Sequence, residues 1–277
     1  MQHLQWFPGH MTAAVRMMEE NLKAVDGVMM VLDARAPKAS INNKLSKMFE
    51  GKKILYVINK SDLITPQDAS RVVKEFEKEG KTAVSVSAMD KRTVDLLYDK
   101  IFELLKDKVE RNVRRGINRP VRIMVTGIPN TGKSTIINAI CGGKKTVTGN
   151  KAGVTKGKQW VRIKDLEFLD TPGTMPPAFE NQTLAKRLAY IGCMNDANLD
   201  FNDLAYELIE ELKDKYPELL KQKYGLENLQ LTTIEILDAI CLRRGFIRKG
   251  NEMDYDRCCV AVIDDLRKGR IGKIIFD

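Results

Sequence analysis

The sequence contains no long hydrophobic run, and unbroken apolar segments such as Val28–Leu32 and Ile54–Ile58 reach only a few residues. A helix that spans a membrane needs about 20 consecutive apolar residues, so we predict a soluble protein without membrane contact. The first 20 residues also lack the apolar core of a secretory signal and contain Pro8, Gly9 and two glutamates. We therefore do not expect export.

Cysteine is scarce, and the five cysteines form no C-x-x-C pair. A disulfide framework needs an even set of cysteines, and structural zinc sites show closely spaced pairs. Both are therefore disfavoured, and we expect a reducing compartment.

The composition is that of a globular protein. Of the 277 residues, 43% are hydrophobic and 30% are charged, which fits one large or two ordinary domains and excludes a disordered chain. The formal net charge of +9 favours a polyanionic partner without proving one. Residues 1–184 carry a net charge of +11 and residues 185–277 a net charge of −2, so the excess lies in the first part.

Two stretches concentrate the positive charge. Lys106–Arg122 holds seven basic and two acidic residues, and Lys144–Lys164 holds seven basic residues and no acidic one. A run of like charges is most often a solvated face. Charge alone therefore assigns no function to either stretch.

The first two thirds of the chain alternate between strand and helix patterns. Strands are predicted at 27–32, 53–58, 82–86, 121–126, 159–163 and 166–169, and helices at 11–25, 70–79, 93–110 and 133–141. This alternation is typical of an α/β fold with a mostly parallel sheet, here of six strands, the last two of which could pair as a hairpin.

The last third shows only helical patterns, at 184–193, 201–216, 232–244 and 255–268. Thr232-x-x-Glu235 is a capping-box signature, and Gly245 fits a helix end. We predict two domains, an α/β domain over residues 1–178 and a small all-α domain over residues 179–277.

Residues Gly127–Ser134 match the P-loop pattern G-x-x-x-x-G-K-[ST], between a predicted strand and a predicted helix. Glycines let backbone N–H groups wrap the phosphates, Lys133 can reach the β- and γ-phosphate oxygens, and the Ser134 hydroxyl can ligate Mg²⁺. We predict phosphate contacts from Asn130, Thr131, Gly132, Lys133, Ser134 and Thr135.

Guanine recognition is suggested by two further segments that close strands. Asn59-Lys60-Ser61-Asp62 fits N-K-x-D, in which the Asp62 carboxylate can accept from both N1–H and the 2-amino group of guanine. The same tetrapeptide also forms ordinary surface turns. Ser87-Ala88 closes the next strand, where the Ala88 N–H can meet guanine O6.

The strand after the P-loop helix ends in Asp170–Gly173, which fits D-x-x-G. This pattern places Asp170 near Mg²⁺, beyond its direct ligands, and the Gly173 N–H near the γ-phosphate. Gly153–Thr155 lies between the two motifs, and we predict Thr155 as a second Mg²⁺ ligand in the triphosphate state. Thr146 and Thr148 are the alternatives.

The order of these motifs is permuted, because N-K-x-D and S-A precede the P-loop and D-x-x-G instead of following them. The sequence resembles the circularly permuted GTPases of the ribosome biogenesis GTPase A (YlqF) type. The resemblance covers about the first two thirds of the chain and is carried by Trp6–Met11, Asp33–Pro37, Asn59–Asp62, Gly127–Ser134, Gly153–Thr155 and Asp170–Gly173.

The resemblance implies a GTPase that binds GTP or GDP with Mg²⁺, associates with the rRNA and proteins of the maturing large ribosomal subunit of bacteria, and leaves on hydrolysis. A low intrinsic rate stimulated by the ribosome fits this picture. Relatives exist in mitochondria, but an Arg-rich, acid-poor leader is absent, which favours the bacterial cytoplasm. We expect a monomer.

The C-terminal domain of this family has been likened to ANTAR-type RNA-binding modules, which would make Arg243, Arg244, Arg248 and Lys249 RNA contacts. A purely structural helical bundle fits these residues equally well.

Another group must orient or activate the attacking water, because Thr174 stands where many G proteins carry the Gln that orients water. Asn130 resembles the asparagine of potassium-stimulated GTPases, where it helps to hold K⁺ beside the phosphates, although it also suits a turn after Pro129. His10 is a second candidate, since a neutral imidazole can orient water. It could instead be packed or contact RNA.

The basic loop at 144–158 contains the predicted switch threonine, so the γ-phosphate would order it. We therefore predict that Lys144, Lys145 and Lys151 form a nucleotide-gated RNA contact. Two other functions fit the same sequence: an RNA-binding module with negligible turnover, and a GTPase that regulates a non-ribosomal partner.

Overall fold

The computed structural model describes residues 9–143, 146, 159–176, 179 and 181–277. The described residues form two compact units, one of residues 9–181 together with Ile275–Asp277, and one of Gln182–Ile274. The expected division lay at residue 178 and assigned the last three residues to the helical part. These residues lie with the first unit because Ile275 packs in its core and the Phe276 N–H donates to the Arg35 carbonyl at 2.7 Å.

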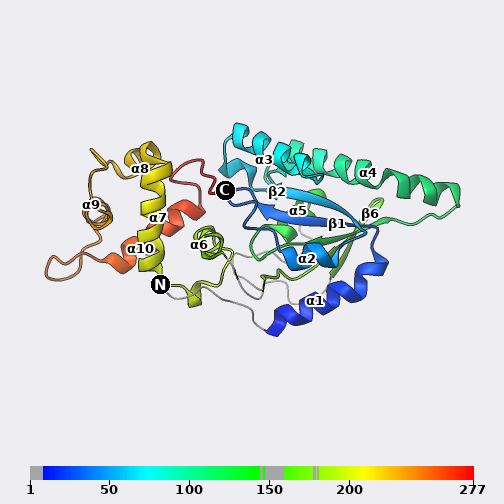
Figure 1. Cartoon of the computed structure of the whole chain (residues 1–277), viewed down its shortest axis with the longest axis horizontal. Coiled ribbons are helices and arrows are strands. Elements are labelled where there is room, and N and C mark those ends of the chain that lie inside the picture. The colour runs from blue at the N-terminus through cyan, green and yellow to red at the C-terminus, as the bar shows by residue number, and fades with distance from the viewer. Residues whose placement is uncertain (1–8, 144–145, 147–158, 177–178, 180) are drawn as a thin grey trace. The chain divides into compact units, whose positions relative to one another are not determined.

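The first unit is built on a six-stranded sheet with the order β3-β2-β1-β4-β6-β5 (Figure 1). The strands are β1 (Gly27–Asp33), β2 (Lys53–Asn59), β3 (Thr82–Val86), β4 (Val121–Thr126), β5 (Gln159–Ile163) and β6 (Leu166–Asp170). All neighbours are parallel except β5 and β6, which form the expected antiparallel hairpin through a turn where Lys164 has φ +48°. The predicted fold class is confirmed.

Helices cover both faces of this sheet. Side chains of α1 (Gly9–Asn21), α2 (Asn43–Met48) and α3 (Pro66–Lys78) share one apolar core, and side chains of α4 (Lys91–Arg114) and α5 (Lys133–Ile140) share the other. Successive strand residues face opposite sides. In β1, Met30 therefore joins the first core and Met29 the second, which buries the whole strand.

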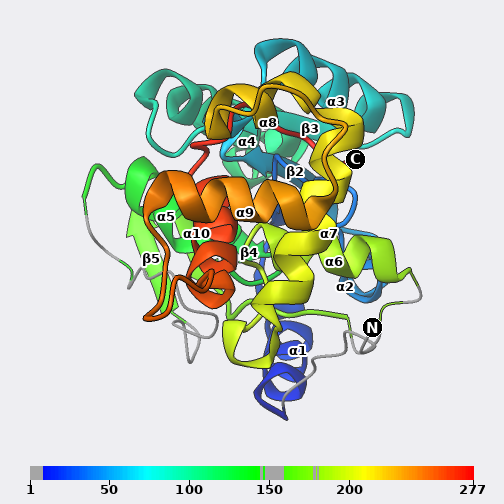
Figure 2. The same ribbon diagram turned by 90° about the vertical axis from the view of Figure 1, so that its left-hand side faces the viewer.

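The second unit contains α6 (Gln182–Tyr190), α7 (Phe201–Lys215), α8 (Pro217–Tyr224), α9 (Thr233–Arg244) and α10 (Tyr255–Arg267), and α10 packs against α7 and α9 (Figure 2). The predicted capping box is present, because Thr232 and Glu235 bond reciprocally at the start of α9. The chain leaves α9 through Gly245, whose φ is +66°.

The buried Asp265 holds three of these helices together. Its carboxylate on α10 accepts from the Tyr224 hydroxyl of α8 at 3.3 Å and from the Arg244 guanidinium of α9.

None of the helices in the described ranges is both long and apolar enough to cross a bilayer.

Candidate nucleotide-binding site

The predicted site segments follow the carboxyl ends of neighbouring parallel strands. The sheet register pairs Asp33 with Asn59, Asn59 with Val86, and Val125 with Asp170. Ligands of open α/β sheets bind at this edge. The structure thus brings the N-K-x-D, S-A, P-loop and D-x-x-G segments together, although they lie far apart in the sequence.

The P-loop between β4 and α5 depends on its glycines. A Cβ on Gly127 would lie 2.3 Å from the Val31 carbonyl oxygen, and a Cβ on Gly132 would lie 2.4 Å from Asn59 Nδ2. Both glycines have positive φ, and so does Asn130, at +61°. Side chains other than glycine rarely adopt such angles, with asparagine among the more tolerant, so the motif fixes the loop by sterics and by backbone conformation together.

Gly173 meets the same loop from the other side. A Cβ there would lie 2.7 Å from Pro129 and 3.0 Å from the Lys133 ammonium. Only glycine therefore lets the D-x-x-G backbone approach the P-loop this closely.

Lys133 is the first residue of α5, and its side chain is buried. The ammonium donates to the carbonyls of Gly127 at 3.2 Å and Ile128 at 2.9 Å. Its positive charge is therefore held over the loop whose shape suits a phosphate.

Ser134 and Asp170 face each other across the site. The serine hydroxyl donates to Asp170 Oδ2 at 2.7 Å, while Asp170 Oδ1 is buried and has no hydrogen-bond partner among the described residues. Burial raises the pKa of this carboxyl group, partly offset by the Ser134 bond and by the charge of Lys133. A hydroxyl beside an incompletely bonded buried carboxylate is a donor set that fits Mg²⁺, which prefers oxygen ligands.

Asn59 ties two of the segments together. Its Nδ2 donates to the Thr131 carbonyl in the P-loop at 2.8 Å, and its Oδ1 accepts from the Ala88 N–H at 3.3 Å. The residue that ends β2 therefore sets the position of the P-loop relative to the S-A segment.

Asp62 lies in a short 3-10 turn, Ser61–Leu63, that follows Lys60 in the left-handed conformation. Its side chain is exposed, and Oδ1 accepts from the Ser87 hydroxyl at 2.7 Å. The carboxylate is thus oriented at the surface of the site, next to Ala88.

Sequence reasoning gave no role to a buried ion cluster beside this site. Asp33 ends β1 and accepts from Arg35 Nε at 2.9 Å, Arg35 Nη2 at 2.8 Å and Lys60 Nζ at 2.6 Å. Lys60 Nζ also donates to the Asn130 carbonyl at 2.7 Å. Burial alone would raise the pKa of Asp33, but the charges of Arg35 and Lys60 hold it well below its usual range. The cluster links β1, the N-K-x-D turn and the P-loop.

The cluster leaves only a weak trace in the sequence. Apart from the match of Asp33–Pro37 to the family motif, the signal is a carboxylate at the end of an apolar strand, two residues before an arginine. The contact of Asp33 with Lys60 depends on the pairing of Asp33 at the end of β1 with Asn59 at the end of β2, which no local pattern shows.

Thr174, at the position of the water-orienting Gln, is buried, and its hydroxyl has no partner among the described residues. Its N–H donates to the Gly127 carbonyl at 3.3 Å and its carbonyl accepts from Asn42 Nδ2 at 3.1 Å. The backbone here joins the P-loop to α2, while the side chain is closed off from water.

Several predicted residues lie outside the described part of the chain: Thr148, Thr155, Lys144, Lys145 and Lys151, together with the side chain of His10 in the first turn of α1. Thr146 is described. Its hydroxyl donates to the Ser134 carbonyl at 3.0 Å, and its N–H donates to Asn138 Oδ1 at 2.8 Å, so this alternative switch threonine is bonded to α5.

The predicted RNA contacts of the second unit take part in bonds within that unit. Arg243 donates to the Tyr224 carbonyl at 3.1 Å, Arg244 bonds to Asp265, and Arg248 bonds to Asp254 and Asp256. Of the four, Lys249 alone is exposed without a bonded partner in the described ranges.

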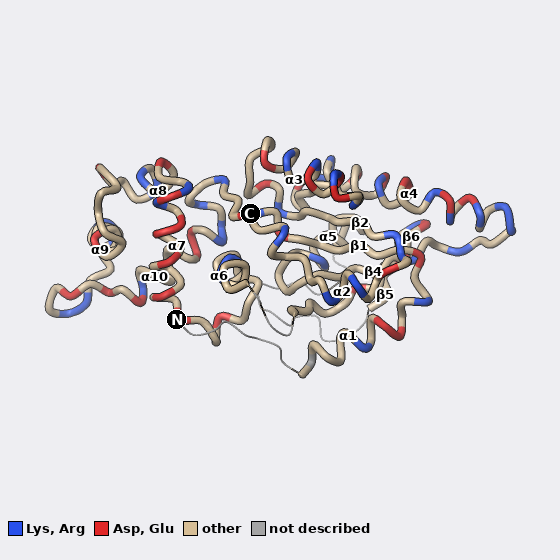
Figure 3. Tube along the Cα trace, viewed as in Figure 1, with Lys and Arg blue, Asp and Glu red and all other residues tan. Residues whose placement is uncertain are grey.

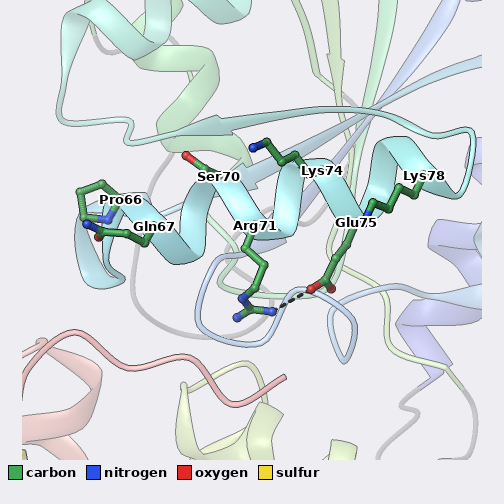
Figure 4. Close-up of a pocket in the computed structure, with 7 residues that line it drawn as sticks. All are labelled: Pro66, Gln67, Ser70, Arg71, Lys74, Glu75 and Lys78. Atoms are coloured by element: carbon green, nitrogen blue, oxygen red, sulfur yellow. Dashed lines mark hydrogen bonds and ion pairs between the residues drawn. The ribbon is translucent and has the colours of Figure 1, made fainter.

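A shallow hollow lies elsewhere on the first unit, along the outer face of α3 (Figure 4). It is lined by Pro66, Gln67, Ser70, Arg71, Lys74, Glu75 and Lys78, and Arg71 is paired with Glu75 at 2.9 Å. None of these residues belongs to the predicted nucleotide site.

The geometry defines a class of protein. A P-loop between β4 and α5, with the N-K-x-D segment before it in sequence but beside it in space, is the arrangement of a circularly permuted P-loop GTPase. A family profile described as 50S ribosome-binding GTPase matches residues 122–235.

Curated proteins named ribosome biogenesis GTPase A match over most of their length. The protein of Priestia megaterium is 36% identical over 99% of this chain and 96% of its own length, and that of Bacillus cereus is 36% identical over 99% and 93%. The chain belongs to the ribosome biogenesis GTPase A family and is a GTPase that binds guanine nucleotides, so the resemblance inferred from the motifs is confirmed.

The solved structure of GNP-bound YlqF from T. maritima covers 96% of this chain and 97% of its own, with a TM-score of 0.64 and 24% identity. At this identity the match supports the fold alone.

Proposed function

We propose that this protein is an assembly factor for the large ribosomal subunit that binds in its GTP state and is released when GTP is hydrolysed. The observation that carries the proposal is the edge of the sheet where Asn59, Lys60, the P-loop and Asp170 meet. The profile's description as a 50S ribosome-binding GTPase and the names of the relatives supply the ribosomal partner. We place the protein in the bacterial cytoplasm.

In this proposal Asp62 accepts from the guanine N1–H and 2-amino groups, and the Ala88 N–H donates to guanine O6. The orientation of Asp62 by Ser87 supports the first role. For the second, the Ala88 N–H leaves its long 3.3 Å bond to Asn59 Oδ1 and turns to guanine O6. The backbone N–H groups of Asn130–Thr135 hold the phosphates, and the Gly173 N–H senses the γ-phosphate.

Lys133 and Ser134 act on the phosphate side. Lys133 leaves its two carbonyl partners for the β- and γ-phosphate oxygens, and Ser134 and Thr155 ligate Mg²⁺ while Asp170 lies close by. Bound Mg²⁺ neutralises the charge that develops on the phosphates. The Ser134–Asp170 bond and the unbonded Asp170 Oδ1 support this assignment.

Hydrolysis requires a group that replaces the missing Gln, since Thr174 is buried. We assign this task to K⁺ held with the help of the Asn130 side chain. The fixed backbone of Asn130, whose carbonyl accepts from Lys60, supports a preorganised cation site. His10 is the alternative that orients the attacking water.

Affinity for the large subunit should depend on the bound nucleotide. With a non-hydrolysable GTP analogue, purified large subunits should pellet more of the protein than with GDP, and should accelerate phosphate release from GTP. Binding to subunits without any stimulation of hydrolysis would favour the RNA-binding module instead. Absence of binding would favour a non-ribosomal partner.

Hydrolysis should be faster in K⁺ than in Na⁺. Asn130→Ala should remove this difference and largely preserve GTP binding, because the backbone cradle remains. Asn130 has φ +61°, so Asn130→Gly is the matched variant that removes the side chain without backbone strain. Rates measured in both salts check the prediction, and a wild type indifferent to the cation would shift the role to His10.

A further inference from the structure

The helix α4 continues well beyond the core that it helps to form. Its buried residues are Val94, Leu97, Ile101 and Leu105, and from Lys106 to Arg114 no residue is buried. These nine residues extend about 13 Å at the rise of an α-helix. Figure 1 shows this end of α4 running past the sheet. We call residues 106–117 the α4 tip.

The α4 tip is a properly closed helix end. The Arg115 N–H donates to the Arg111 carbonyl at 3.2 Å, and the Ile117 N–H donates to the Asn112 carbonyl at 2.9 Å across Gly116, whose φ is +66°. This glycine termination satisfies the last carbonyls. The tip is therefore a defined surface, and Val109 at its start packs against the apolar core.

Three basic side chains in the tip or beside it stabilise the fold. Lys108 and Arg119 pair with Asp26 at 3.6 and 2.8 Å, and Arg122 pairs with Glu167 at 2.6 Å while its guanidinium lies over Trp160. These residues anchor the root of the tip and the segment that leads into β4.

The other basic side chains of the tip contribute little to the fold. Lys106 and Arg114 share Glu110 through exposed contacts of 4.0 and 3.5 Å, which contribute little. Arg111 and Arg115 are exposed and form no ion pair within the described part of the chain. Figure 3 shows this concentration of positive charge at the end of α4.

Folding alone does not account for this arrangement. Arg111 in the last turn complements the helix dipole, which contributes about 0.3–1 kcal/mol. Arg115 lies four residues further along, and like charges at this spacing repel each other by about 0.2–0.5 kcal/mol. Val113, 71% exposed, adds an apolar group beside them that the fold leaves uncovered.

We propose that the α4 tip is a second RNA-contact surface, in which Arg111 and Arg115 bind backbone phosphates of structured RNA. The inference rests on the proposed function and extends it to a surface outside the nucleotide site. Arginine forks match phosphate geometry, and Asn112 and Asn118 add donors and acceptors for sugar hydroxyls. A protein partner fits less well, because Val113 and Ile117 are too few to form the apolar centre of an interface.

The test compares two double variants of the full chain. Arg111→Gln with Arg115→Gln removes the unpaired charges of the tip. Lys74→Gln with Lys78→Gln is the matched control, because these residues have the same spacing, are exposed on α3 (Figure 4) and form no ion pair among the described residues. Binding to purified large subunits is measured by pelleting with a non-hydrolysable GTP analogue over a range of salt concentrations.

The tip variant should bind about tenfold more weakly, and the slope of log K against log salt should fall by about two, one for each lost phosphate contact. The control and the GTPase rate without ribosomes should not change. Unchanged binding of the tip variant overturns the proposal, and so does an equal loss in the control, which would show that only net charge matters.

A 20-base-pair RNA duplex separates this proposal from the proposed function. If the wild type ignores large subunits but binds the duplex, and the tip variant loses that binding, the RNA surface stands and the ribosomal function fails. If the wild type binds subunits and the tip variant keeps its affinity for both probes, the ribosomal function stands and the tip proposal fails.

Discussion

Replacing Asp62 with asparagine should convert a protein that prefers GTP into one that prefers xanthosine triphosphate. The carboxylate, oriented by the Ser87 hydroxyl at 2.7 Å, can accept two hydrogen bonds from guanine. An asparagine amide instead offers one acceptor and one donor, which suits the N1–H and C2 carbonyl of xanthine. Adenine has neither the N1–H nor the 2-amino group, so the wild type should bind ATP about 10⁴-fold more weakly than GTP.

The loss of GTP affinity that we expect in Asp62→Asn follows from the same hydrogen bonds. Hydrogen bonds to a charged group contribute about 1.5–3 kcal/mol each, and neutral ones about 1 kcal/mol less. Asparagine loses one of the two bonds and keeps the other only as a neutral one, so GTP binding should weaken by about 10²–10³-fold. Competition against a fluorescent guanine nucleotide measures all three affinities. Asp68→Asn is the control, since that carboxylate pairs with Arg71 on α3 and its loss should leave every nucleotide affinity unchanged. Equal affinity of the wild type for ATP and GTP would overturn the guanine assignment.

The strands could be predicted from the sequence because buried strands are short apolar runs that end at polar residues. The predicted bounds of β3, β4 and β5 agree with the structure. The helices α2 and α8 escaped prediction, since six and eight residues give too few turns to show a period. The end of α4 was placed too early, at Glu110, because charged and polar residues predominate in its last turn.

The motifs of the site were visible because each is a local pattern with a chemical reason. Their mutual contacts were not, since they depend on strand register. The approach of Gly173 to Pro129 and the bonds of Asn59 to both Thr131 and Ala88 join segments that no local pattern connects. The sequence showed Asp33–Pro37 only as a matching motif and gave no reason for it.

The second large effect is expected when the Asp33 cluster is disrupted, because its residues contribute both to folding and to nucleotide binding. Asp33→Asn removes the negative charge that Arg35 and Lys60 share, at a site where the Arg35 side chain is only 3% exposed. Breaking a buried ion pair from one side typically costs about 3–5 kcal/mol. The free energy of unfolding, measured by urea denaturation, should fall by about that amount.

The acid stability of the protein should change in a defined direction. The Arg35 and Lys60 charges hold the pKa of Asp33 below its usual range. Its contribution is therefore fully present above the pKa of an unfolded aspartate, about 3.9, and is lost as the pH falls below that value. In Asp33→Asn this part of the acid dependence should be missing, whereas the dependence at neutral pH should match the wild type.

The bond from Lys60 to the P-loop allows the effect on stability and the effect on GTP binding to be tested separately. Lys60→Met keeps the Asp33–Arg35 pair, so its stability should stay closer to that of the wild type. It removes the bond to the Asn130 carbonyl, however, and GTP affinity should fall because the loop is no longer held in shape. Lys38→Met is the control, since it breaks an exposed pair with Glu75 on the same unit and should cost less than about 1 kcal/mol. If Lys60→Met bound GTP as tightly as the wild type, Asp33 would serve the stability of β1 alone, and its connection to the nucleotide site through Lys60 would be wrong.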